Sequence, residues 1–214
     1  MLHSKDFFSM VEEKQTLRRI LIMSVAQPIR DLDELEHLKN YYLNIQPNLR
    51  NHVLIITGIN TALRISDILK LKWKDVYNFQ MHAFRQHITL IEQKTGKKTC
   101  IAMNKSLTIA LARYKNSLKE IQPEMYLFYG KYKNKHLSRS QAFRIIKQAC
   151  VKLQLSEHFT CHSLRKTFGY HAWNSGADPT LLMVIYNHSS FTITKRYLGI
   201  EQDDKDQIFL NLNL

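Results

Sequence analysis

Glycine, proline and cysteine are all scarce in this chain of 214 residues, which holds six, four and three of them. With so few glycines and prolines, and with no internal repeat or low-complexity tract, no stretch resembles a flexible linker between domains. The cysteines Cys100, Cys150 and Cys161 are odd in number and far apart in the sequence. They therefore indicate no disulfide framework and favour a reducing compartment.

Long apolar runs are absent as well. No stretch approaches the length of about 18 apolar residues that a membrane-spanning helix needs, so we expect no membrane association and a cytoplasmic protein. The run 20–26 behind Arg18 and Arg19 is too short and begins too late to be a signal peptide. We expect one main domain over 29–214, with a tail from about 201, and an appendage at 1–28 that includes an amphipathic helix at about 6–26.

Positive charge is what the chain has in excess. Its 31 lysines and arginines stand against 18 acidic residues, which gives a net charge of +13. Such a surface suits a polyanionic partner, and nucleic acid is the first candidate. Charge alone also fits a ribosome-associated or anionic-lipid-binding protein, so it does not decide the function.

Hydrophobic periodicity and capping residues predict a mainly helical chain. Asp31, Ser138 and Asp178 are suitable N-caps, Pro179 suits a first helical position, and Ser66 can cap a short helix. The expected helices cover about 31–43, 49–61, 106–118, 138–153, 162–174 and 179–186.

One segment alternates as a strand does. Ile88 and Leu90 alternate with polar residues, and a second short strand at 99–102 follows a turn that contains Gly96. This pattern predicts a β-hairpin with Lys94 at the end of its first strand. The fold class expected is mainly α with a small antiparallel β-sheet (α+β).

A histidine and an arginine three residues apart are the first candidates for chemistry. His162 and Arg165 would lie on one face of the helix expected at 162–174, where the pair could hold one phosphate. Such a pair is common on solvated helices, so taken alone it proves little. Together with His162, the nearby His158, Cys161 and His171 also suggest zinc, but the spacing matches no common zinc motif and we expect no metal.

Five elements in chain order resemble the catalytic domain of tyrosine recombinases of the phage-integrase type. The segment 61–67 (TALRISD) resembles the one that carries their first arginine, Arg64, and Lys94 matches their hairpin lysine. His162 and Arg165 match their His-x-x-Arg motif. The stretch 187–190 (NHSS) resembles their Gly-His-Ser element, and Tyr197, nine residues after His188, stands where the family keeps its nucleophile. The resemblance covers roughly 31–200.

The resemblance implies a site-specific recombinase that acts on double-stranded DNA without a cofactor. Tyr197 would form a 3′-phosphotyrosine and Lys94 would protonate the leaving 5′-hydroxyl. Arg64, Arg165 and His188 would bind the phosphate, and His162 would assist proton transfer. Asp67 would orient an arginine, or would simply be a carboxylate in the first turn of a helix. A tetramer on two DNA sites would exchange strands, with the tail either docked on a neighbouring protomer or folded on its own core.

The sequence departs from the family pattern in two ways, and two rival functions stay open. Asn187 stands where the family usually has glycine, and Asn tolerates the left-handed backbone better than most residues. Thirty residues cannot supply the family's separate DNA-clamping domain, so we expect either a piece of a longer protein or a relative that manages without it. A type IB topoisomerase shares the chemistry, and a DNA-binding regulator could keep the fold without turnover.

Overall fold

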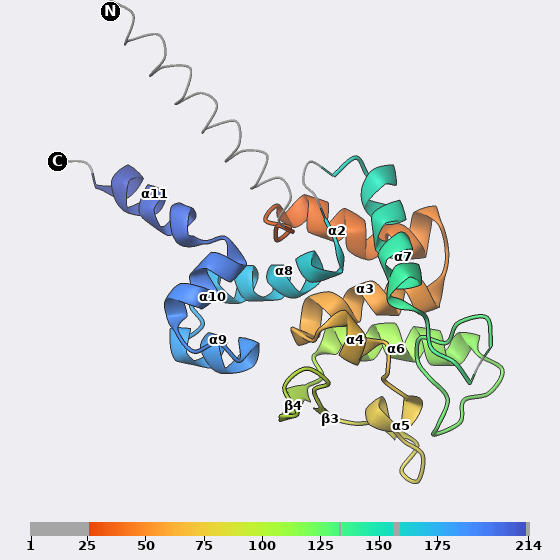
Figure 1. Ribbon diagram of the computed structural model, residues 1–214. Coiled ribbons are helices and arrows are strands. Elements are labelled where there is room, and N and C mark those ends of the chain that lie inside the picture. The colour runs from red at the N-terminus through yellow and green to blue at the C-terminus, as the bar shows by residue number, and fades with distance from the viewer. Residues whose placement is uncertain (1–25, 133, 156–158, 213–214) are drawn as a thin grey trace, which may run out of the picture.

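A computed structural model describes residues 26–132, 134–155 and 159–212 (Figure 1). The helix expected at about 6–26 lies outside these residues. Within them the chain is mainly helical and holds two small antiparallel sheets, so the predicted fold class is confirmed. None of the described helices is both long enough and apolar enough to cross a membrane.

The N-terminal half is built around one buried helix, α3 (Leu49–Thr61). Before it come α2 (Leu32–Asn40), which Asp31 caps as predicted, and a π-helical turn, η1 (Tyr41–Ile45). Helix α3 packs against the later helices α6 and α8, which explains why nearly all of its residues are buried. After it, the chain forms two single-turn helices, α4 (Ile65–Ile68) and α5 (Trp73–Val76).

The start of α4 differs from the prediction. The helix begins at Ile65, one residue before the expected cap Ser66, and Arg64 occupies the N-cap position with an extended backbone. No side chain caps this helix, because the guanidinium of Arg64 carries only hydrogen-bond donors. Ala62 ends α3 in the left-handed conformation, so only Leu63 separates that turn from the N-cap of α4. Arg64 is thereby held at a sharp junction between two helices.

The strands form two separate pairs rather than the single sheet expected. Strands β1 (Tyr77–Asn78) and β2 (Ala83–Phe84) make a short hairpin that the sequence did not predict. The predicted hairpin pairs β3 (His87–Ile91) with β4 (Lys98–Ala102), and Ile91 lies opposite Lys98. Because β3 ends at Ile91, Lys94 lies in the turn and not in the strand, and Gly96 adopts φ +67° there.

Two of the remaining helices begin at the predicted caps, whereas the cap of α8 and the helices α10 and α11 were not predicted. Ser138 caps α7, Asp178 caps α9 with Pro179 at its first position, and Thr160 caps α8. The bounds are α6 (Lys105–Ser117), α7 (Arg139–Lys152), α8 (Cys161–Asn174), α9 (Pro179–Tyr186), α10 (Phe191–Leu198) and α11 (Glu201–Asn211).

Close packing around Gly169 brings the last helices of the domain beside α8. A methyl group at this position would lie 2.5 Å from both the Tyr186 hydroxyl and a Leu198 methyl, so only glycine allows α9 and α10 to approach this far. Tyr186 and Leu198 belong to a small second core that covers this side of α8, apart from the main core around α3.

Helix α11 extends beyond α10, away from the main core (Figure 1). Its apolar side chains Ile208, Phe209 and Leu210, and Leu212 just after it, are 61–82% exposed. The tail therefore does not bury these side chains against its own core, which was one of the two alternatives expected from the sequence.

Candidate active site

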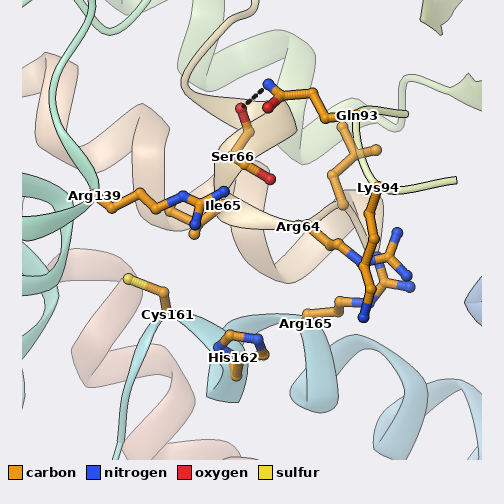
Figure 2. A pocket seen from close by; sticks show the side chains of 10 residues that line it. Arg64, Ile65, Ser66, Gln93, Lys94, Arg139, Cys161, His162 and Arg165 are labelled. Atoms are coloured by element: carbon orange, nitrogen blue, oxygen red, sulfur yellow. Dashed lines mark hydrogen bonds between the residues drawn. The ribbon is translucent and has the colours of Figure 1, made fainter. Parts of the chain in front are cut away.

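A pocket of about 390 Å³ opens where α4, the β3–β4 turn, α7 and α8 meet. Four of the six predicted site residues line it, although they are up to about a hundred positions apart in the sequence. They are Arg64, Lys94, His162 and Arg165. Figure 2 shows the side chains of Arg64, Lys94 and Arg165 converging on one side of this pocket.

The first turns of α8 supply two of these groups. Thr160 and Ser163 form a reciprocal capping box, which fixes where the helix begins and hence which way its first side chains point. His162 and Arg165 then project from one face, as their spacing predicts. Arg165 is buried, and its own carbonyl accepts a hydrogen bond from the Tyr186 hydroxyl at 2.7 Å.

Arg64 is oriented by a carboxylate that the sequence interpretation did not single out. Its Nη1 lies 2.5 Å from Oε2 of Glu92, whose side chain is only 6% exposed. Asp67, the arginine partner expected from the sequence, accepts the Gln93 backbone N–H at 3.0 Å instead. The prediction that Asp67 orients an arginine is therefore wrong, and the alternative, a carboxylate in the first turn of a helix, holds.

Two contacts with α4 anchor the hairpin turn that carries Lys94. Besides the Asp67 carboxylate, the Ser66 carbonyl accepts a hydrogen bond from the Gln93 side chain at 3.0 Å, drawn as a dashed line in Figure 2. Gln93 immediately precedes Lys94, whose side chain is exposed and extends along the pocket. The turn therefore holds its lysine beside Arg64 while leaving the ammonium group accessible.

His188 and Tyr197 lie together on the far side of Arg165. Their ring centroids are 5.3 Å apart, and both rings also contact Tyr186. His188 follows Asn187, which ends α9 with φ +56°, so the left-handed backbone expected at this position is confirmed. The Asn187 side chain also accepts a hydrogen bond from Lys97, which joins this loop to the β3–β4 turn.

Arg165 joins the two halves of the site. Its guanidinium lies 4.8 Å from the Tyr186 ring centroid, and its charge acts on the Tyr197 phenol, whose ring also has the Lys166 ammonium 5.1 Å from its centroid. Burial raises the pKa of the Tyr197 phenol, while the neighbouring Arg165 and Arg64 guanidinium groups oppose that rise. Tyr197 is therefore protonated at neutral pH and needs a base before it can act as a nucleophile.

Both histidines have lowered pKa values. Desolvation is the main cause for His162, followed by the charges of Arg165, Lys166, Arg64 and Lys94. The pKa of His188 is lowered by desolvation first and then by the charges of Arg165 and Arg64. At neutral pH both imidazoles are mainly neutral, so each can accept a proton or share a hydrogen bond.

Glu92 and Arg139 are site residues that the sequence interpretation missed. A signal for Glu92 was present, because strand alternation places it on the inward face with Ile88 and Leu90, where a carboxylate requires a cation. Arg139, the first residue of α7, lines the pocket from the opposite side (Figure 2). Nothing in its local sequence separates it from other surface arginines.

A zinc site finds no support in the geometry. Among the described residues, no three His, Cys, Asp or Glu side chains gather closely enough to hold a metal ion. His171 lies 2.9 Å from the Ile29 carbonyl through its Nε2, on the side of α8 that packs against the start of the domain. His158 lies outside the described residues.

Comparison with protein families and curated sequences places the chain among recombinases. The Phage integrase family matches residues 31–203. The "Probable integrase/recombinase YoeC" of Bacillus subtilis is 44% identical over 181 residues, which are 85% of this chain and 93% of that protein. The "Tyrosine recombinase XerA" of Pyrococcus horikoshii is 27% identical over 74% of this chain, which spans only 53% of XerA.

Solved structures show the same fold. A crystal structure of XerA recombinase matches with a TM-score of 0.68 and 20% identity, over 88% of this chain and 64% of XerA. XerH site-specific recombinase, bound to its palindromic difH substrate in a post-cleavage complex, matches with a TM-score of 0.66 and 17% identity. That match covers 86% of this chain and 53% of XerH. The solved structures confirm the fold, and the family match over residues 31–203 confirms the resemblance predicted from the motifs.

Proposed function

The chain belongs to the phage integrase family, and from this premise we propose that its site breaks and rejoins DNA strands through a covalent bond to Tyr197. One observation carries the proposal most directly. Arg165 lines the pocket together with Arg64, Lys94 and His162, and its positive charge also opposes the rise that burial causes in the pKa of the Tyr197 phenol. A phosphate held by that arginine would therefore lie beside the nucleophile.

The pocket is suited to the charge of a phosphodiester in its transition state. Arg64 and Arg165 offer rigid guanidinium forks that match two non-bridging oxygens, and burial of Arg165 strengthens its interaction with an anion. His188, beside Tyr197, adds a hydrogen bond to the same phosphate. Charge that develops on the five-coordinate phosphorus is thus balanced by groups already in place, which is the main source of catalysis at such a site.

Proton transfers complete the step. The Tyr197 oxygen attacks phosphorus as its proton passes to a base, a task that suits the neutral His162 imidazole. The bond from phosphorus to the 5′-oxygen breaks, and Lys94 protonates that oxygen. A 3′-phosphotyrosine and a free 5′-hydroxyl remain. Because the ester keeps the energy of the broken bond, a 5′-hydroxyl from another strand can reverse the reaction.

We assign double-stranded DNA as the partner and site-specific recombination as the outcome. The net charge of +13 favours a polyanion. The names of the relatives point to integrases and recombinases, and XerH was solved on its DNA substrate. Recombination further requires that protomers on two DNA sites assemble, and we propose a tetramer for this step.

A trapped adduct tests the proposed function. On its cognate duplex, nicked so that the 5′-hydroxyl fragment diffuses away after cleavage, the protein should accumulate as a DNA adduct that resists denaturation. The adduct should also form in EDTA, because Arg64 and Arg165 supply the positive charge. Failure to form any adduct on that site would favour a DNA-binding regulator. Relaxation of supercoiled DNA without strand exchange would favour a type IB topoisomerase.

Replacement of Lys94 should slow cleavage while leaving DNA binding nearly intact. Lys94→Ala removes one exposed charge among many from the binding surface, yet it removes the proposed general acid, a contribution of about 10²–10⁴-fold in rate. Single-turnover cleavage should be compared on substrates with a 5′-oxygen and a 5′-sulfur leaving group, since a thiolate leaves without a proton. An equal defect on both substrates would contradict the role of Lys94, and Lys98→Ala would be examined next.

The exposed tail is proposed to dock on a neighbouring protomer. Phe209 is 79% exposed on α11, so a second copy could bury it without disturbing the domain. Phe209→Asp should still form the Tyr197 adduct but should lose the tetramer on two-site DNA, as measured by analytical ultracentrifugation. Asn211→Asp adds the same charge at a polar, exposed position and serves as the control. Tetramers of the Phe209 variant as stable as those of wild type would exclude this docking.

A further inference from the structure

A buried carboxylate that pairs with an arginine of the proposed phosphate pocket requires an explanation. Glu92 would repel the phosphate that Arg64 and Arg165 are proposed to bind, and its side chain is only 6% exposed. We propose that Glu92 is a positioning residue that ties Arg64 to the turn carrying Lys94, so that both cations face one phosphate. This inference rests on the proposed function.

The contacts of Glu92 reach the arginine and both sides of the turn. Its Oε2 accepts hydrogen bonds from Arg64 Nη1 at 2.5 Å and from the Thr95 hydroxyl at 3.0 Å. Its Oε1 accepts one from the Thr99 hydroxyl at 3.2 Å. A single carboxylate thus links helix α4 to residues on either side of Gly96.

The backbone of Glu92 closes the same turn. Its N–H donates to the Lys97 carbonyl at 2.9 Å, and its carbonyl accepts from the Gly96 N–H at 2.8 Å. Lys94 lies between these anchored positions, so the Glu92 contacts restrict the position of its Cα together with those of Gln93. The placement of the lysine therefore depends on Glu92 through the main chain and through Thr95.

Electrostatics explains why a charged anchor is needed. Without Glu92, Arg64 would lose its ion-pair partner while it faces Lys94 and Arg165, and mutual repulsion would turn its flexible side chain toward solvent. The carboxylate offsets that repulsion and uses one edge of the guanidinium, which leaves other N–H donors for the phosphate. Glu92 thus weakens the attraction of the pocket for phosphate slightly, but it holds the Arg64 guanidinium in position.

Replacement of Glu92 with glutamine should therefore separate DNA binding from cleavage. Glu92→Gln keeps the size of the side chain but removes its charge, so duplex affinity should stay the same or rise. Single-turnover cleavage at a 5′-oxygen should fall by about tenfold or more, because a displacement of the order of 1 Å can lower a rate about 10²-fold. With a 5′-sulfur leaving group the defect should be smaller, since the position of Lys94 then no longer matters.

A pair of threonine variants supplies the matched control. Thr95→Val removes one hydroxyl that contacts Glu92 and should slow cleavage with the same dependence on the leaving group. Thr89→Val makes the same change on the same hairpin, where the hydroxyl contacts Cys100 instead, and should cleave as wild type does. Wild-type cleavage by Glu92→Gln, or a defect equal on both leaving groups, would overturn the proposal.

A measurement on the resting protein keeps the test independent of turnover. The side-chain Nε–H resonance of Arg64, assigned by its loss in Arg64→Lys, should show a restricted guanidinium in wild type and a freely rotating one in Glu92→Gln. An equally restricted guanidinium in the variant would overturn the proposal. If wild type forms no adduct, the proposed function fails, and this resonance still decides the role of Glu92.

Discussion

Tyr197→Phe should form no covalent adduct with DNA while keeping the fold and the affinity of the wild-type protein. The substitution removes only the attacking oxygen and leaves the ring that packs against Tyr186 and His188. Loss of the nucleophile in a covalent enzyme lowers the rate on the order of 10⁶-fold, so the adduct should fall below detection. The measurement is gel electrophoresis of the trapped complex under denaturing conditions.

Tyr186→Phe is the matched control for that variant. Tyr186 is the ring nearest to Tyr197 among the described tyrosines, but its hydroxyl is buried and donates to the Arg165 carbonyl at 2.7 Å. Its removal should lower the free energy of unfolding by about 1–2 kcal/mol and leave adduct formation in place. An adduct that survives in Tyr197→Phe but disappears in Tyr186→Phe would make Tyr186 the nucleophile.

Arg165→Lys should slow cleavage by about 10²–10³-fold, the effect of losing one preorganised donor to developing charge. Lysine keeps the positive charge but cannot provide the guanidinium fork, so two oxygens of one phosphate are no longer held together. Lysine cannot replace the fork here, because the Arg165 guanidinium lies over the Tyr186 ring and its charge acts on the Tyr197 phenol. Single-turnover rates and thermal unfolding should be measured on the same preparations.

Arg85→Lys is the control for this substitution. Arg85 is outside the pocket, and its Nε donates to the Lys74 carbonyl at 2.7 Å. This variant should cleave at the wild-type rate. A loss below about tenfold in Arg165→Lys, accompanied by a much lower melting temperature, would mean that Arg165 serves mainly to hold α8 against α9.

The sequence by itself determined the parts of this protein that depend on near neighbours. Helix starts at Asp31, Ser138 and Asp178 follow from side chains that cap backbone groups two or three residues away. The hairpin follows from alternation, and the shared face of His162 and Arg165 follows from helical spacing. The family motifs also include His162 and Arg165, and the match over 31–203 confirms the family.

Only the tertiary structure decided which distant groups meet. Arg64 pairs with Glu92 across 28 positions instead of with Asp67, three residues away, because the sharp junction after α3 points its side chain toward the hairpin. Arg139 reaches the pocket because α7 and α8 pack together, and the missing side chain of Gly169 lets Tyr197 lie beside Arg165. Such encounters depend on the packing of whole helices, which local propensity does not encode.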